Sequence, residues 1–107
     1  MIFTKEHIEK IREGKKTETR RIWKHPHVKV GKVYGIRTDR FKPVPSDAPR
    51  IKIQSISREL LRDITFEGAI KEGCQSLGDF MDIWIKLHGS WNPNQEIYVV
   101  KFLRVEL

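Results

Sequence analysis

The spacing of hydrophobic and polar positions changes along the chain, and each spacing predicts a different element. Over residues 5–13 the apolar side chains recur at helical intervals, with Thr4 in front as an N-cap and Gly14 behind. Residues 16–23 lose this period and are rich in β-forming residues, which predicts a strand. Another strand is expected over residues 32–38. The first third of the chain therefore reads as a helix followed by two strands.

The rest of the chain continues to mix strands and helices. Residues 39–50 hold three prolines and predict a surface loop, which leads into a half-buried strand over residues 50–56. A short helix is expected over residues 66–72 and a longer one over residues 77–88, where apolar residues lie three and four apart. The last strand is expected over residues 96–105. The predicted fold class is α+β, a small, mostly antiparallel sheet or barrel with helices inserted near its ends.

Length and composition limit this architecture to one compact unit. The chain has 107 residues and no repeat or linker, so we expect a single domain over residues 1–107. One cysteine excludes an internal disulfide and favours a reducing compartment, which predicts a cytoplasmic protein. No apolar stretch approaches the roughly 20 residues that span a bilayer. We therefore expect neither membrane insertion nor secretion.

The positive charge of the chain is concentrated in one segment. The net charge is +7, and residues 15–32 carry seven Lys and Arg against Glu18 alone, a local excess of six. A scattered excess would indicate solubility, whereas a clustered excess favours a polyanionic partner such as nucleic acid. Four aromatic residues also lie in or beside polar stretches, where a ring can stack on an unpaired base. They are Trp23, Tyr34, Phe41 and Trp91.

Several short motifs follow one another along most of the chain. The first two are Gly-Lys-Lys-Thr-Glu-Thr-Arg-Arg at 14–21 and Val-Gly-Lys-Val-Tyr at 30–34. The next are Ala-Ile-Lys-Glu-Gly at 69–73 and Ser-Leu at 76–77 with Phe80. The last group is Trp84, Gly89, Trp91 and Pro93, followed by a strand with Val-Val-Lys-Phe at 99–102. In this order they resemble the signature of ASCH domains. Lys32 departs from it, because many relatives have Asp at that position.

The resemblance to ASCH domains implies both a fold and a set of functions. It implies a PUA-like fold, a small pseudo-barrel with a cleft beside the 14–21 segment. The role it implies is RNA binding, linked to translation, RNA processing or coactivation. A small bacterial branch of similar length hydrolyses the acetyl amide of N4-acetylcytidine with a Lys, a Thr and a Glu. By motif position these residues would be Lys16, Thr19 and Glu72.

One functional hypothesis is a binding module for RNA or a modified nucleotide. Cations of the basic segment would pair with phosphates, while hydroxyl and carboxylate groups would read base or ribose edges. The alternative explanation of the same residues is a solvated strand edge, where lysine prevents aggregation. The candidate binding residues are Lys15, Lys16, Thr17, Arg20, Arg21, Lys24, Arg37 and Trp91, beside Thr19 and Glu72.

The alternative hypothesis is a small amidohydrolase. Thr19 would be the nucleophile, Lys16 the base and Glu72 the acid or the orienting group. Lys16 lies among other cations, which lowers the pKa of an amine and makes it a better base. In an ideal strand residues 16 and 19 point to opposite faces, so this set requires Lys16 on the turn after Gly14, or a bulge. Otherwise all three residues are ordinary surface or strand residues.

The remaining titratable residues predict no further site. His25 and His27 flank Pro26 without a third ligand at a metal-binding spacing. Cys74 has no Cys-His motif around it, and His88 is explained by the helix C-terminus at which it is expected. We therefore expect no metal and no cofactor. The expected ligand is an RNA, a nucleoside or a nucleotide.

Overall fold

Three α-helices and four strands are found in residues 1–106, the part of the chain that the computed structural model describes. Their order is the one predicted from the sequence. The elements are α1 (Lys5–Arg12), β1 (Glu18–Arg21), β2 (Val33–Gly35), β3 (Arg50–Leu60), the 3-10 turn η1 (Leu61–Asp63), α2 (Phe66–Lys71), α3 (Leu77–His88) and β4 (Glu96–Val105). None of the described helices is long and apolar enough to cross a membrane.

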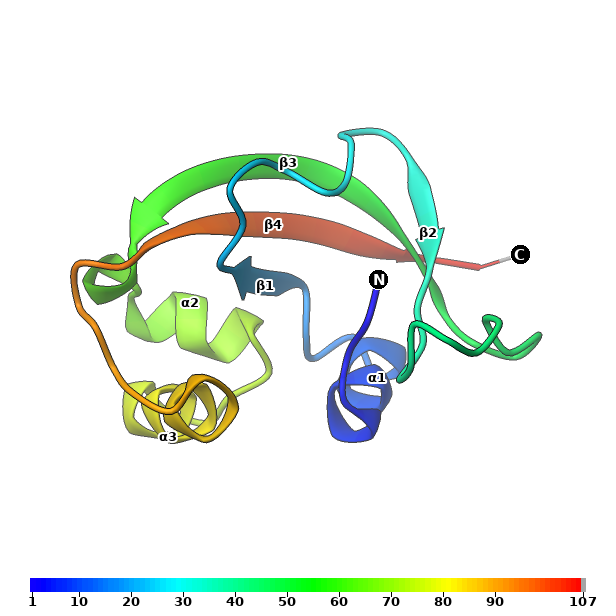
Figure 1. The fold of residues 1–107 in the computed structure, drawn as a ribbon. Coiled ribbons are helices and arrows are strands. Elements are labelled where there is room, and N and C mark those ends of the chain that lie inside the picture. The colour runs from blue at the N-terminus through cyan, green and yellow to red at the C-terminus, as the bar shows by residue number, and fades with distance from the viewer. Residues whose placement is uncertain (107) are drawn as a thin grey trace.

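The four strands form one strongly curled sheet in the order β1-β4-β3-β2. Each neighbouring pair is antiparallel, and β3 and β4 are the long central strands. Figure 1 shows these two strands arching over the helices, with α2 and α3 under one end of the arch and α1 under the other. The sheet is a half-barrel, because β1 and β2 remain at its two edges.

Three strands differ in length from the prediction, and the one expected at 32–38 is reduced to β2 (Val33–Gly35). The predicted strand at 50–56 continues to Leu60, because β4 is long enough to pair with it up to Glu96. The extension was not predicted because the second half of the strand is mostly polar. The register of β3 shifts between Ile53 and Ser55, and such an irregularity bends a strand. The predicted strand at 16–23 is reduced to the four residues of β1.

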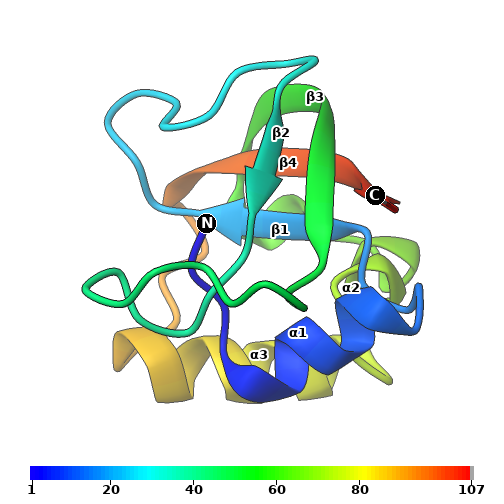
Figure 2. The ribbon, with the colours of Figure 1, turned by 90° about the vertical axis from the view of Figure 1, so that its right-hand side faces the viewer.

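Each of the three helices begins after a threonine or serine cap, and Thr4 was predicted as the cap of the first. The side-chain oxygens of Thr4, Thr65 and Ser76 each accept a hydrogen bond from a backbone N–H in the first turn of α1, α2 and α3. Such caps satisfy donors that a helix start leaves free. Figure 2 shows α1 and α3 below β1, with the short β2 crossing in front of the sheet. The N-terminal segment, α1, β1 and α3 thus surround one region of the molecule.

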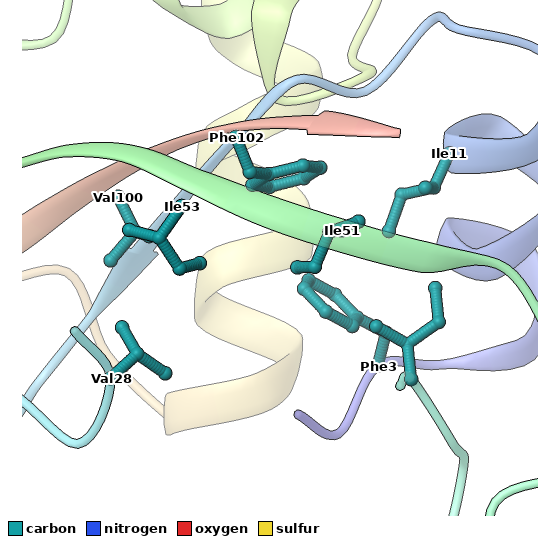
Figure 3. Close-up of a cluster of buried hydrophobic side chains, with 8 residues drawn as sticks. Phe3, Ile11, Val28, Ile51, Ile53, Val100 and Phe102 are labelled. Carbon is teal, nitrogen blue, oxygen red and sulfur yellow. The ribbon is translucent and has the colours of Figure 1, made fainter. Parts of the chain in front are cut away.

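The core consists of two clusters of buried side chains. The first lies under β3 and β4, where Phe3, Ile51 and Phe102 point toward one another (Figure 3). The second lies between the sheet, α2 and α3, and includes the buried rings of Phe80 and Trp84. The first cluster contains Phe3, Ile11, Val28, Ile36, Ile51, Ile53, Val100 and Phe102, and the second contains Leu61, Ile64, Ala69, Cys74, Phe80, Trp84, Ile97 and Val99.

Candidate functional site

A lysine with almost no access to solvent lies among these elements. The side chain of Lys16 is 1% exposed. Its Nζ donates to the Glu72 carboxylate oxygen Oε1 at 2.7 Å, to the Glu72 carbonyl at 3.0 Å and to the Glu18 carbonyl at 2.9 Å. Three acceptors match the three N–H groups of an ammonium. Burial lowers the pKa of Lys16 below its usual value, and the charge of Glu72 offsets part of that effect.

The carboxylate of Glu72 also binds a buried arginine. Arg20 Nη1 donates to Glu72 Oε2 at 3.2 Å, and its Nε donates to Glu59 Oε1 at 3.0 Å. Arg20 Nη2 lies 3.3 Å from Glu18 Oε1. Among the described residues no buried side-chain nitrogen or oxygen lacks a hydrogen-bond partner. The result is a network of two buried cations and three carboxylates, with Glu72 bridging the cations and the partly exposed Lys71 3.8 Å from Glu18 Oε2.

Local backbone structure explains how Lys16 and Glu72 meet. The amides of Lys15 and Lys16 donate to the Lys10 carbonyl, which turns the chain inward after α1. Glu72 is the C-cap of α2, and the next residue, Gly73, has a φ of 91°. A Cβ at Gly73 would lie 2.9 Å from Lys10 Cδ. A residue without a side chain is therefore required where α2 ends beside α1.

A second glycine makes room for the guanidinium of Arg20. Gly68 lies inside α2, where glycine is normally unfavourable. A Cβ at Gly68 would lie 2.8 Å from Arg20 Nη2. That nitrogen cannot move aside easily, because carboxylates bind the guanidinium at Nε, Nη1 and Nη2. The glycine of α2 thus serves the ion-pair network.

The network forms one wall of a cleft of about 300 Å³ between the N-terminal segment, α1, β1 and α3. Apolar side chains form much of the rest of the lining and include the Trp84 ring of α3. The polar lining residues are Thr4, His7, Lys16, Thr19, Arg20, Arg21, Glu72 and His88, and the remaining ones are Ile2, Phe3, Cys74, Phe80, Ile83, Trp84 and Leu87. We call this space the candidate cleft.

Thr19 and Arg21 lie together on the polar wall. Thr19 is buried, and its Oγ1 accepts a hydrogen bond from Arg21 Nε at 3.2 Å. Arg21 Nη2 donates to the Ile2 carbonyl at 2.7 Å, and its guanidinium lies 4.8 Å from the centre of the Phe3 ring. These contacts hold the guanidinium between the N-terminal segment and the cleft. Burial lowers the pKa of Arg21 from its usual value.

His7 of α1 adds an imidazole to the same wall. Burial, with a smaller effect of the nearby Lys16 charge, lowers the pKa of His7 to about 4. The ring is therefore neutral at pH 7. A neutral imidazole offers one donor and one acceptor nitrogen to a ligand.

The structure brings five of the predicted site residues to the candidate cleft: Lys16, Thr19, Arg20, Arg21 and Glu72. Lys16 lies on the turn before β1, which is the arrangement that the amidohydrolase hypothesis requires. Among the described residues, however, Thr19 Oγ1 makes no hydrogen bond to Lys16 or Glu72; its partner is Arg21.

The other predicted residues lie elsewhere. Lys15 is exposed and pairs with Glu13 at 2.8 Å, and Lys24 is exposed. The Thr17 amide donates to the Lys71 carbonyl, a purely structural contact. Arg37 lies in a neighbouring groove. Trp91 packs edge-on against Phe80, so this ring closes the second core cluster and is absent from the cleft lining.

Several residues of the site were not predicted from the sequence. Glu18 and Glu59 complete the ion-pair network, and His7 lines the cleft. One feature of the sequence could have drawn attention to Glu18, because it is the lone acid of the basic segment. Trp84 of α3 is buried in the second core cluster and also lines the cleft. In residues 1–106 no group of three His, Cys, Asp or Glu side chains is placed to hold a metal ion.

Comparisons with known proteins identify the fold. No family model and no curated protein matches the sequence. The ASCH domain from Lactobacillus crispatus JV V101 superposes with a TM-score of 0.74 at 16% identity, over 92% of this chain and 69% of that one. The hypothetical protein PH0355 superposes with a TM-score of 0.64 at 17% identity, over 96% of this chain and 94% of that one. A protein from Enterococcus faecalis V583 of family DUF984 superposes with a TM-score of 0.61 at 14% identity, over 91% of this chain and 65% of that one.

These likenesses define the class of fold. The chain has an α+β fold with a curled antiparallel half-barrel, and this fold is that of the ASCH domain. The resemblance predicted from the motifs, and the fold class that it implied, are thereby confirmed at the level of the three-dimensional structure.

The buried ion pair should show strong coupling between its two residues. Lys16→Met leaves a buried carboxylate undercompensated, and Glu72→Gln does the same to the ammonium, so each should lower the free energy of unfolding by about 3 kcal/mol or more. The double variant should lose about 1–3 kcal/mol less than the sum of the two, as measured by urea unfolding.

The matched control is Lys15→Met, which removes the preceding lysine and its exposed pair with Glu13. This change should leave the urea midpoint unchanged. Strictly additive losses in the double variant would show that Lys16 and Glu72 act independently.

Proposed function

We propose that the candidate cleft binds a nucleoside unit of RNA or a modified nucleotide. The observation that carries this proposal is the pairing of an aromatic, apolar wall with a wall of hydrogen-bonding groups in one cleft. A nucleoside has the same division, because its base faces are apolar and its base edges and ribose are polar. The cleft volume of about 300 Å³ lies at the lower end of small-ligand sites.

The polar wall has unused hydrogen-bonding capacity. Each oxygen of the Glu72 carboxylate accepts one side-chain hydrogen bond within the protein, from Lys16 and from Arg20, and a carboxylate has about four acceptor positions. The Thr19 hydroxyl accepts from Arg21 and still has a proton to donate. Donors and acceptors are thus available for the edge of a base or for ribose hydroxyls.

Phosphate binding would fall to only some of the predicted cations. Lys16 and Arg20 are buried and bound to protein oxygens, so they serve the structure of the wall. Arg21 is half-buried on the cleft, and Lys15 and Lys24 are exposed. The remaining exposed lysines of the 15–32 segment would attract a polyanion by their summed field.

Nucleoside binding should depend on the Thr19 hydroxyl. Calorimetric titration should give a measurable affinity for cytidine or N4-acetylcytidine, and Thr19→Val should weaken it roughly two- to tenfold, the value of one hydrogen bond. Affinity for single-stranded RNA should fall with salt, with a slope of roughly 0.7 for each phosphate contacted.

The control for this titration is Thr38→Val, which changes an exposed threonine outside the cleft and should leave both affinities as they are. Absence of binding to any nucleoside and to RNA would refute the proposal. Equal losses in the two threonine variants would place the ligand outside the candidate cleft.

A second candidate function is hydrolysis of an N4-acylated cytidine. It is favoured by the presence of Lys16, Thr19 and Glu72 at one cleft, with Lys16 on the required turn. A proton passing from Lys16 to Glu72 along their 2.7 Å hydrogen bond would free the amine to take the Thr19 proton. Thr19 Oγ1 would then attack the acetyl carbon, and the C–N4 bond would break as protonated Glu72 gives its proton to N4, so that cytidine leaves. Water would add to the acetyl ester of Thr19 and give a proton to Glu72. The ester C–O bond would then break as Lys16 returns a proton to Thr19 Oγ1, which releases acetic acid, and the Glu72 proton would pass back to Lys16.

Chromatography after incubation with N4-acetylcytidine tests this second function. The protein should release cytidine and acetate, Thr19→Ala should abolish turnover, and Thr38→Ala should retain it. Turnover that survives Thr19→Ala would exclude Thr19 as the nucleophile. Binding of N4-acetylcytidine without any turnover would leave the cleft a binding site and exclude the hydrolase.

A further inference from the structure

A second groove adjoins the candidate cleft. It has a volume of about 260 Å³, and its lining includes Trp23, His27, Tyr34 and Arg37. Two residues, Ile2 and Arg21, line both this groove and the candidate cleft. The two spaces therefore meet at Arg21. We call the second space the aromatic–arginine groove.

One wall of the aromatic–arginine groove consists of stacked rings. The rings of Trp23 and His27 lie parallel, with centroids 4.7 Å apart and an interplanar angle of 15°. The Tyr34 hydroxyl accepts a hydrogen bond from the Lys29 amide at 2.9 Å, which fixes the position of its ring. Trp23 and Tyr34 are half-buried and His27 is exposed, so ring surface remains open to a ligand. Such surfaces stack on nucleobases of any sequence.

The arginines of this groove make no ion pair among the described residues. No Asp or Glu lines it. Among the described residues no carboxylate lies within salt-bridge distance of Arg21 or Arg37, whereas Arg20 next in sequence pairs with three. The hydrogen bonds of Arg21 and Arg37 to backbone carbonyls hold both guanidinium groups in place. A fixed guanidinium that lacks a carboxylate is suited to bind a phosphate.

Packing alone explains only part of this arrangement. Trp23 and Tyr34 touch the first core cluster, which accounts for the inner faces of their rings. It does not account for two arginines held beside them that make no ion pair within residues 1–106. Stacking rings and phosphate-binding cations together match a nucleotide.

We propose that the aromatic–arginine groove binds the nucleotide next to the one in the candidate cleft. The ligand is then a single-stranded RNA segment of at least two nucleotides, with its linking phosphate at Arg21, where the two spaces meet. The second base stacks on the rings, and Arg37 binds a phosphate of the same strand. This inference rests on the proposed function, because it takes the first nucleoside to lie in the candidate cleft.

Calorimetry with cytidine and with the dinucleotide cytidylyl-cytidine tests the second subsite. The wild type should bind the dinucleotide at least about tenfold more tightly than cytidine, since one stacked base and one phosphate are added. Trp23→Leu, which keeps an apolar side chain, should remove most of this gain. Arg37→Gln should also reduce it and should lower the salt slope for longer single-stranded RNA by roughly 0.7.

The matched control is Arg62→Gln, an exposed arginine of η1 that lines neither space and should leave both affinities unchanged. An unchanged affinity for cytidine shows that a variant is folded. If Trp23→Leu does not fold, the dinucleotide affinity of Arg37→Gln tests the second subsite. Equal wild-type affinity for cytidine and the dinucleotide would overturn the subsite while leaving the proposed function intact. A full dinucleotide gain in both variants would overturn it as well. Failure to bind either ligand would refute the proposed function, and the subsite with it.

Discussion

The buried ion pair between Lys16 and Glu72 is the interaction on which the rest of the site depends. Lys16 comes from the turn after α1, and Glu72 ends α2, so their 2.7 Å contact joins the two helical parts under the sheet. Removing an ion pair from water costs several kcal/mol per ion unless further polar groups compensate. Arg20 and the two backbone carbonyls provide that compensation.

The ion-pair network also divides the positive charge of the chain into two groups. Cations inside the network build the cleft wall, and their charges are matched by Glu18, Glu59 and Glu72. Two arginines outside it, Arg21 and Arg37, make no ion pair with a carboxylate of the described residues and face the two adjoining spaces. A cluster of positive charge in a sequence therefore indicates binding of a polyanion only through those cations that the fold leaves without an ion pair.

Local patterns in the sequence predicted most of the fold and part of the site. Periodicity and capping residues placed α1, α2 and α3, because both depend on neighbours within a few positions. The motif resemblance brought Lys16, Thr19 and Glu72 together. The burial of Lys16 could not be predicted, since it depends on a contact 56 positions away in sequence. The position of Arg37 outside the candidate cleft could not be predicted either, because it also depends on tertiary contacts.

The most direct test of the candidate cleft is mapping of backbone amide shifts in nuclear magnetic resonance spectra during a cytidine titration. Shifts should concentrate at Thr19, Glu72, Cys74 and Trp84, which come from three separate parts of the chain and meet at the cleft. The exposed loop at residues 39–47 should remain unchanged. Shifts confined to that loop, with none at the cleft residues, would contradict the assignment.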